Sequence, residues 1–134
     1  MSTVFNNNGL LTDKGVEYFV NQIAAGQVID FYEFKVFFDD TLTDLTDDQI
    51  RQTTAPTGTE VSNITKSLTL EAYNATTILI KCDITNTSGS SITINQIGIY
   101  NDTGDLIWYG IFPDTTIGSG DTEQIQIPIN ISAQ

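Results

Sequence analysis

The side chains with the clearest chemical potential in this sequence are the carboxylates of residues 39–48. Five of the 17 acidic residues of the chain lie within these ten positions. Closely spaced carboxylate oxygens could coordinate Ca²⁺. The segment lacks the central glycine and the terminal glutamate of an EF-hand loop, so its pattern favours a solvated or partner-facing acidic loop over a metal site. We name Asp44, Asp47 and Asp48 as its candidate contacts with a partner.

A second stretch imitates the oxygen spacing of a calcium loop at Asn101, Thr103 and Asp105. Phe112 stands where the glutamate ligand would be required, so the stretch predicts a turn instead. Glycosidase-like chemistry needs two carboxylates held in one cleft, and nothing in the sequence pairs two of the acids. We therefore expect no metal, no cofactor and no catalytic residue.

Aromatic and apolar side chains are concentrated in and beside residues 106–112. This strand carries large apolar residues at both odd and even positions, which point to opposite faces, so it is expected to be buried on both faces or to supply an interface. Its rings, with Tyr100, could pack in the core, anchor a protein interface or stack on sugars. The candidate partner-binding residues of this hairpin are Leu106, Trp108, Tyr109 and Phe112.

The composition excludes several classes of function. Histidine is absent and cysteine occurs once, so Ser-His-Asp or Cys-His machinery, histidine-ligated metals and an internal disulfide cannot form. Five Lys and Arg residues against 17 Asp and Glu give a net charge of -12, so nucleic acid and anionic membranes would repel the chain. The start lacks the features of a signal peptide, and no stretch is apolar enough to span a membrane. A soluble, non-enzymatic protein is expected, without nucleic-acid binding or membrane insertion.

The elements that position these groups begin with a helix over residues 12–25. Thr12 suits its N-cap, and acidic residues follow in the first turns. An apolar stripe at helical spacing predicts that the helix covers a sheet. Residues 29–38 then alternate with period two, which predicts a strand with an aromatic inner face. Residues 39–63 predict a long loop with one short turn of helix capped by Thr46.

Short strands account for the rest of the chain. We expect them over residues 64–72, 77–85, 91–100, 106–112 and 124–131. In residues 91–100 the alternation of apolar residues shifts by one position, which predicts a β-bulge near Gln96. Pro128 favours an edge position for the last strand. Cys82 is expected to be a buried apolar residue. One N-terminal helix followed by about six strands indicates an α+β fold with a mainly antiparallel sheet or a sandwich-like arrangement. Its 134 residues form a single predicted domain over residues 1–134.

Two motifs resemble the bacteriophage tail-collar fibre family. Residues 11–15 read Leu-Thr-Asp-Lys-Gly, similar to the Leu-Thr-x-x-Gly helix with which that family begins. Residues 94–100 read Ile-Asn-Gln-Ile-Gly-Ile-Tyr and lead through an Asp/Gly turn to Leu-Ile, again in the order of the family. Gln96 stands where the family usually has Glu, and residues 39–63 lack its Gly-rich pattern. The positions that carry the resemblance are Gly15, Ile97, Gly98, Tyr100, Gly104 and Leu106.

The resemblance implies a virion structural protein made in the cytoplasm of a bacterial host. Domains of this family attach a tail fibre, commonly a trimer, to the baseplate or collar of a phage or phage-derived particle. The expected partners are therefore a tail or baseplate protein and further copies of the chain, with a trimer favoured. The alternative is a carbohydrate-binding or receptor-binding module of the host surface that uses Tyr100, Trp108 and Tyr109.

Overall fold

The structure is a computed structural model that describes residues 2–5 and 8–130. Within these residues the chain is α+β, with two helices and nine strands arranged in two mostly antiparallel sheets, so the predicted fold class is confirmed. Ile131, which the sequence assigns to the last strand, lies outside the described residues. Among the helices of the described part, none has the length and apolar character needed to cross a membrane.

The chain divides into two compact units, each built from separate segments. Unit 1 comprises Met1–Asn7, Ser62–Thr93 and Thr115–Gln134, and unit 2 comprises Asn8–Val61 and Ile94–Asp114. Each unit holds one of the two sheets, apart from the ends of two strands that the division cuts. A single domain over residues 1–134 stays a prediction.

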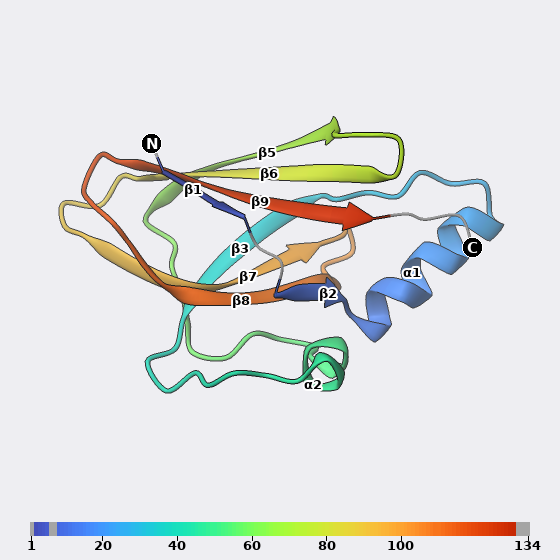
Figure 1. The fold of residues 1–134 in the computed structure, drawn as a ribbon, viewed down its shortest axis with the longest axis horizontal. Coiled ribbons are helices and arrows are strands. Elements are labelled where there is room, and N and C mark those ends of the chain that lie inside the picture. The colour runs from blue at the N-terminus through green and yellow to red at the C-terminus, as the bar shows by residue number, and fades with distance from the viewer. Residues whose placement is uncertain (1, 6–7, 131–134) are drawn as a thin grey trace. The chain divides into compact units, whose positions relative to one another are not determined.

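Unit 1 is a four-stranded sheet in the order β1-β9-β6-β5 (Figure 1). Its strands are β1 (Ser2–Phe5), β5 (Ile64–Ala72), β6 (Thr77–Asn86) and β9 (Thr122–Asn130). β1 runs parallel to β9, and the other neighbours are antiparallel. One face of β6 and β9 is mainly apolar and largely buried, and it includes Cys82, whose predicted burial is confirmed. Its other fully buried members are Ile80, Ile84, Ile125 and Ile127.

The position of Pro128 corrects the expected place of the last strand. β9 lies between β1 and β6, so it is not an edge strand. β1 pairs only with residues 123–126 of β9, whereas Pro128 lies beyond that segment and opposite Leu79 of β6. The missing N–H of Pro128 therefore falls where β1 no longer covers β9, which is why a proline is tolerated there.

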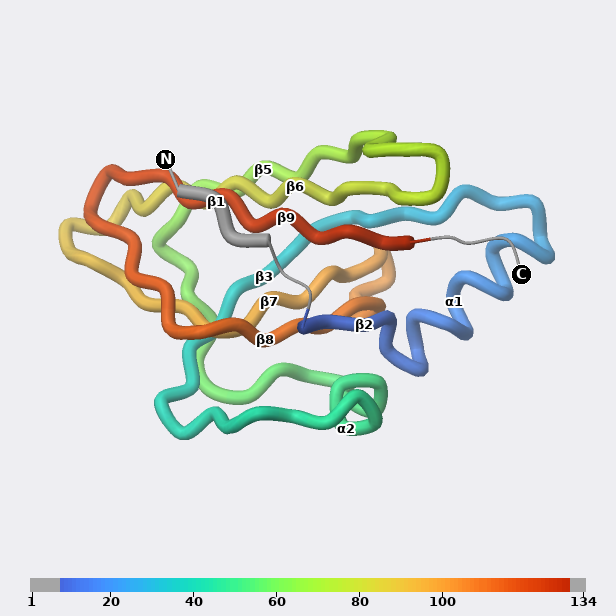
Figure 2. Tube along the Cα trace, in the orientation of Figure 1, coloured from blue at the N-terminus to red at the C-terminus, as the bar shows by residue number. Residues whose placement is uncertain are grey.

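Unit 2 contains a five-stranded sheet in the order β2-β8-β7-β3-β4, and both helices (Figure 1). Figure 2 traces the path from β2 through the first helix into β3. The strands are β2 (Gly9–Leu11), β3 (Glu33–Phe38), β4 (Thr59–Glu60), β7 (Ile92–Tyr100) and β8 (Leu106–Ile117), and the helices are α1 (Asp13–Ala24) and α2 (Asp47–Gln52). The sequence pattern missed β1, β2 and β4, because strands of two to four residues leave no readable alternation.

Helix α1 forms where predicted but does not cover a sheet with its apolar stripe. Thr12 is the N-cap, and its side chain accepts a hydrogen bond from the Gly15 N–H. Val20 and Ile23 of the stripe are 60% and 70% exposed. Phe19 instead packs edge-on against Phe31 of the segment that returns to the sheet, with ring centroids 5.9 Å apart. The helix is held against β8 chiefly by its N-cap and first turn.

Strand β7 pairs regularly where a bulge was expected. Residues 96–100 lie opposite residues 33–37 of β3 in unbroken antiparallel register, so the bulge predicted near Gln96 is absent from this pairing. All of residues 94–100 are buried, and the apolar phase slips because the strand is covered on both faces. The polar Gln96 is accommodated in the interior by hydrogen bonds.

The loop after β3 contains the short helix that Thr46 was expected to cap. The Thr46 side chain accepts a hydrogen bond from the Gln49 N–H, and the Gln49 side chain accepts one from the Thr46 N–H, forming a capping box around α2. Ile50 of α2 is buried with residues of the β7 and β8 strands. This cluster fixes the acidic loop against the hairpin of unit 2.

Candidate functional site

The hairpin side chains named as candidate docking residues are buried within the chain. Trp108 is 3% and Tyr109 1% exposed, and Leu106, Phe112 and Tyr100 are also buried. The Trp108 ring covers Gly9 of β2 so closely that a Cβ at that position would overlap it. Of the roles that the sequence left open for these rings, the structure shows packing in the core, and the rings are not presented to a partner on the surface of the chain. The sugar-stacking alternative loses the exposed rings that it required.

Gln96, where the sequence predicted a bulge, is instead the centre of a buried hydrogen-bond network. Its fully buried side chain accepts a hydrogen bond from the Tyr109 hydroxyl at 2.5 Å and donates one to the Thr57 carbonyl at 2.9 Å. The Thr57 N–H in turn donates to the Gln96 Oε1 at 3.2 Å. One side chain thus ties the loop after β3 to the β8 strand. The available signal was a polar residue at the point where the apolar phase slips.

Burial also shifts the ionisation of two tyrosines of unit 2. Desolvation raises the pKa of Tyr109 to about 12, with a further contribution from the negative charge of Asp39. Desolvation likewise raises the pKa of Tyr100 to about 12, aided by Glu60 and Glu33. Both phenols are therefore neutral across the physiological range, and the Tyr109 hydroxyl donates a hydrogen bond to the Gln96 side chain.

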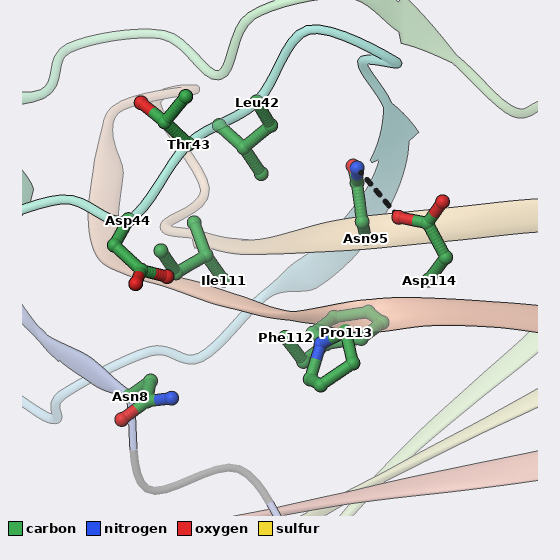
Figure 3. A pocket seen from close by; sticks show the side chains of 9 residues that line it. All are labelled: Asn8, Leu42, Thr43, Asp44, Asn95, Ile111, Phe112, Pro113 and Asp114. Atoms are coloured by element: carbon green, nitrogen blue, oxygen red, sulfur yellow. Dashed lines mark hydrogen bonds between the residues drawn. The ribbon is translucent and has the colours of Figure 1, made fainter.

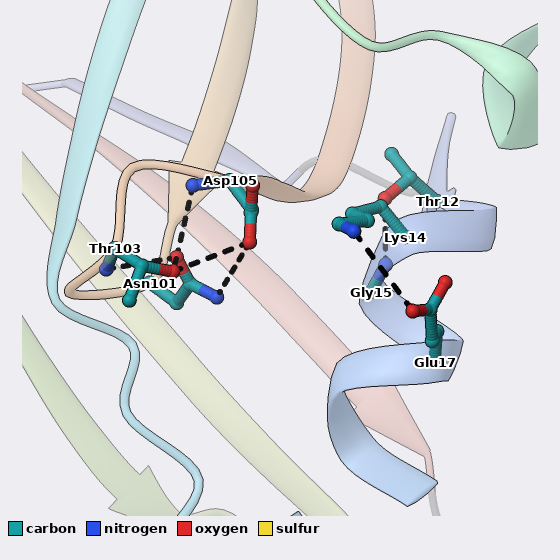
Figure 4. A network of polar contacts seen from close by, with 7 residues as sticks. All are labelled: Thr12, Lys14, Gly15, Glu17, Asn101, Thr103 and Asp105. Carbon is teal, nitrogen blue, oxygen red and sulfur yellow. Dashed lines mark hydrogen bonds and ion pairs between the residues drawn. The ribbon is translucent and has the colours of Figure 1, made fainter. Parts of the chain in front are cut away.

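The first turn of α1 is joined to β8 through Thr12 and Gly15, whose positions at the start of the helix are shown in Figure 4. The Thr12 N–H donates to the Ile107 carbonyl at 3.0 Å, and its hydroxyl donates to the Leu106 carbonyl at 2.6 Å. Gly15 is buried, and a Cβ on it would overlap the Ile107 carbonyl oxygen. The Thr-x-x-Gly spacing therefore has a structural cause: the threonine caps the helix and holds the strand, while the glycine lets the two backbones touch.

The remaining motif positions surround the turn between β7 and β8. A Cβ on Gly98 would overlap the Leu106 side chain and approach the Tyr100 ring, so this glycine also permits close packing. Gly104 has a φ of 87°, which the predicted turn requires. The buried Asn101 side chain accepts hydrogen bonds from the backbone N–H groups of Thr103 and Asp105 (Figure 4). Side chains of α1 and this turn line a polar cavity of about 370 Å³.

The acidic loop borders a second cavity, of about 330 Å³, in unit 2 (Figure 3). Asp44 and Asp114 lie toward opposite sides of it. Asp114 accepts a hydrogen bond from the Asn95 side chain at 3.2 Å. Four side chains give the cavity apolar walls between the two carboxylates: Leu42, Ile111, Phe112 and Pro113. Among the residues that the structure describes, no lysine or arginine lines this cavity, so its electrostatic character favours a cationic group.

The other acids of the loop are engaged separately rather than gathered around one point. Asp48 pairs with Arg51 at 3.1 Å in α2, where Asp47 also lies in the first turn. Asp39 accepts hydrogen bonds from the hydroxyl and N–H of Thr41, which lower the pKa of its carboxyl. Within the described residues, no group of three or more Asp, Glu or Cys side chains is close enough to hold a metal ion. Asp44, Asp47 and Asp48 all remain exposed.

The negative charge of the chain is concentrated in unit 2. Its segments contain thirteen of the 17 Asp and Glu residues and three of the five Lys and Arg residues, so unit 1 is close to neutral by comparison. The net negative charge of unit 2 is larger than a domain of this size needs for solubility. It favours contact between unit 2 and a basic surface.

No protein-family model, curated protein or solved structure matches the chain.

Proposed function

We propose that the protein is a non-enzymatic attachment module of a phage or phage-derived tail, which docks to a tail or baseplate protein. The observation that most supports this proposal is the junction of α1 with the β7–β8 hairpin. Gly15 of the tail-collar resemblance occupies a position where a Cβ would overlap the Ile107 backbone carbonyl, and a Cβ on Gly98, another of its glycines, would displace the Leu106 side chain. Positions that a fold requires in this way are the ones expected to persist among distant members of a family.

The docking surface follows from which candidate residues are exposed. The aromatic side chains of the hairpin are buried, whereas Asp44, Asp47 and Asp48 are exposed on the acidic loop. The cavity between Asp44 and Asp114 combines apolar walls with carboxylates, a combination suited to the aliphatic stem and charged tip of a lysine or arginine. The proposed partner surface is therefore basic. By the same resemblance, the attached module is an oligomer, with a trimer favoured, and its place is the virion.

The test is binding of the purified chain to purified tail particles, measured by co-sedimentation over a range of salt concentrations. The triple variant Asp44→Asn/Asp47→Asn/Asp48→Asn is expected to lose at least tenfold in affinity. The control Asp13→Asn/Glu17→Gln/Asp102→Asn removes the same charge from the α1 side of unit 2 and should bind within about twofold of the wild type. Attachment is contradicted if the wild type fails to sediment with particles, and the acidic surface is contradicted if both variants weaken binding equally.

A further inference from the structure

The two sheets differ in how their edges are terminated. The sheet of unit 2 ends in β2 and β4, which have three and two residues. Very short edge strands are a common protection against unwanted strand pairing. The sheet of unit 1 ends on one side in β5, which has nine residues and pairs only with β6 among the described strands (Figure 1). β5 also contains neither proline nor glycine.

Hydrogen bonds at the two ends of β5 show which backbone groups point outward. The Tyr73 N–H donates to the Thr77 carbonyl at 3.1 Å, and the Asn63 carbonyl accepts from the Thr87 N–H at 3.3 Å. In an antiparallel pair, every second residue directs its N–H and C=O at the neighbouring strand. Odd-numbered residues from 63 to 73 therefore face β6. The N–H and C=O groups of Leu68 and Leu70 point away from the sheet.

The same even-numbered residues carry the apolar face of β5. Leu68 lies opposite Cys82 and Leu70 opposite Ile80, and both of these β6 residues are fully buried. Residues directly opposite in adjacent strands project to the same face. Leu70 is nevertheless 53% exposed, because no further strand continues the apolar face beyond β5. A strand added here would cover apolar area and satisfy outward backbone groups together.

The charge near this edge permits the approach of an identical chain. β5 carries one positive and one negative side chain, Lys66 and Glu71, and Glu71 is paired with Lys81 of β6. Unit 1 as a whole contains only four of the 17 acidic residues. Self-association through the strongly acidic unit 2 would meet electrostatic repulsion between the two copies. Association through β5 meets little electrostatic repulsion.

We propose that β5 pairs antiparallel with β5 of a second copy of this chain, around a twofold axis at Thr69. In this register Leu68 lies opposite Leu70 of the second copy, and each pair exchanges two backbone hydrogen bonds. Lys66 lies opposite Ala72, so no like charges face each other. A shift by one residue is excluded, because outward groups of one copy would then meet inward groups of the other. This pairing does not rest on the attachment role proposed above. It joins two copies of the free chain in solution, whereas the trimer of that proposal is the state of the module attached to the particle.

The test combines light scattering with residue-resolved hydrogen exchange of the full chain at several concentrations. We expect a mass of two chains at high concentration. The amides of Leu68 and Leu70 should then exchange at least tenfold more slowly than in dilute samples, while Thr69 and Glu71, which bond to β6, should change by less than twofold. Circular dichroism should show that each variant chain is folded.

Leu70→Lys places a charge at the proposed contact, on a side chain already half exposed. It should return the mass to one chain and restore fast exchange at Leu68. The matched control Thr65→Lys adds the same charge to β5 outside the Leu68–Leu70 pairs and should remain dimeric. A chain that stays single at all concentrations overturns the proposal. So does a dimer or trimer whose Leu68 and Leu70 amides stay unprotected, although a trimer of that kind would agree with the attachment role.

Discussion

Gly15→Ala tests whether α1 is held against β8 as closely as the structure shows. On helix propensity alone, alanine in place of glycine stabilises a helix by up to about 1 kcal/mol. The structure predicts the opposite sign, because the new Cβ would overlap the Ile107 carbonyl oxygen and lift the first turn away. The two hydrogen bonds from Thr12 to the Leu106 and Ile107 carbonyls would then be lost. Each is worth about 1 kcal/mol, with a further 1–3 kcal/mol for the overpacking.

The net expectation for Gly15→Ala is a loss of about 2–4 kcal/mol in the free energy of unfolding, which lowers the urea midpoint by about 1–2 M. Urea unfolding followed by circular dichroism measures it. Gly89→Ala is the matched control, because a Cβ at Gly89 meets nothing within 4 Å and its φ is not positive. It should be neutral or slightly stabilising. An unchanged or raised midpoint for Gly15→Ala would refute the close contact between α1 and β8.

Three further outcomes are expected. Gln96→Leu leaves the Tyr109 hydroxyl and the Thr57 backbone without partners and should cost about 2–4 kcal/mol in urea unfolding; an unchanged midpoint would contradict the network. The folded pKa of about 12 for Tyr100 and Tyr109 lies above the unfolded value of 10, so their contribution to stability is complete below pH 10 and is lost as the pH rises toward 12. Tyrosinate absorbance and the free energy of unfolding, measured at each pH, would detect this loss; a free energy of unfolding that stays constant above pH 10 would refute it. Cys82, fully buried and with its pKa raised by desolvation, should react with a thiol reagent only in urea, and reaction at the same rate in native buffer would contradict its burial.

Local signals in the sequence predict much of the fold of this chain. Thr12 and Thr46 mark the starts of both helices because capping is a short-range interaction, and both caps are present. The turn at Gly104 forms because its positive φ is a local requirement. The burial of Cys82 follows from the alternation of buried and half-buried residues along β6, which holds from Ile80 to Asn86. These features depend on neighbours within a few residues.

Long-range packing explains what the sequence did not predict. The stripe of α1 has the spacing of a buried face, yet Val20 and Ile23 stay exposed because contact is made through Gly15 at the helix start. The phase slip at Gln96 is typical of a bulge, but here it reflects burial on both faces and a hydrogen bond to a residue 13 positions away. For the hairpin aromatics the sequence left burial in the core open beside an interface, and long-range packing decides for the core. Spacing along the chain does not specify which surface covers a strand.

The location of the chain in intact particles tests the proposed attachment role most directly. Purified tail particles would be labelled with an antibody to the chain and imaged by electron microscopy, with the copy number measured by quantitative mass spectrometry. The account predicts label at the baseplate or collar and a fixed copy number per particle. Particles of full composition that lack the chain, or label confined to the host cell surface, would contradict it.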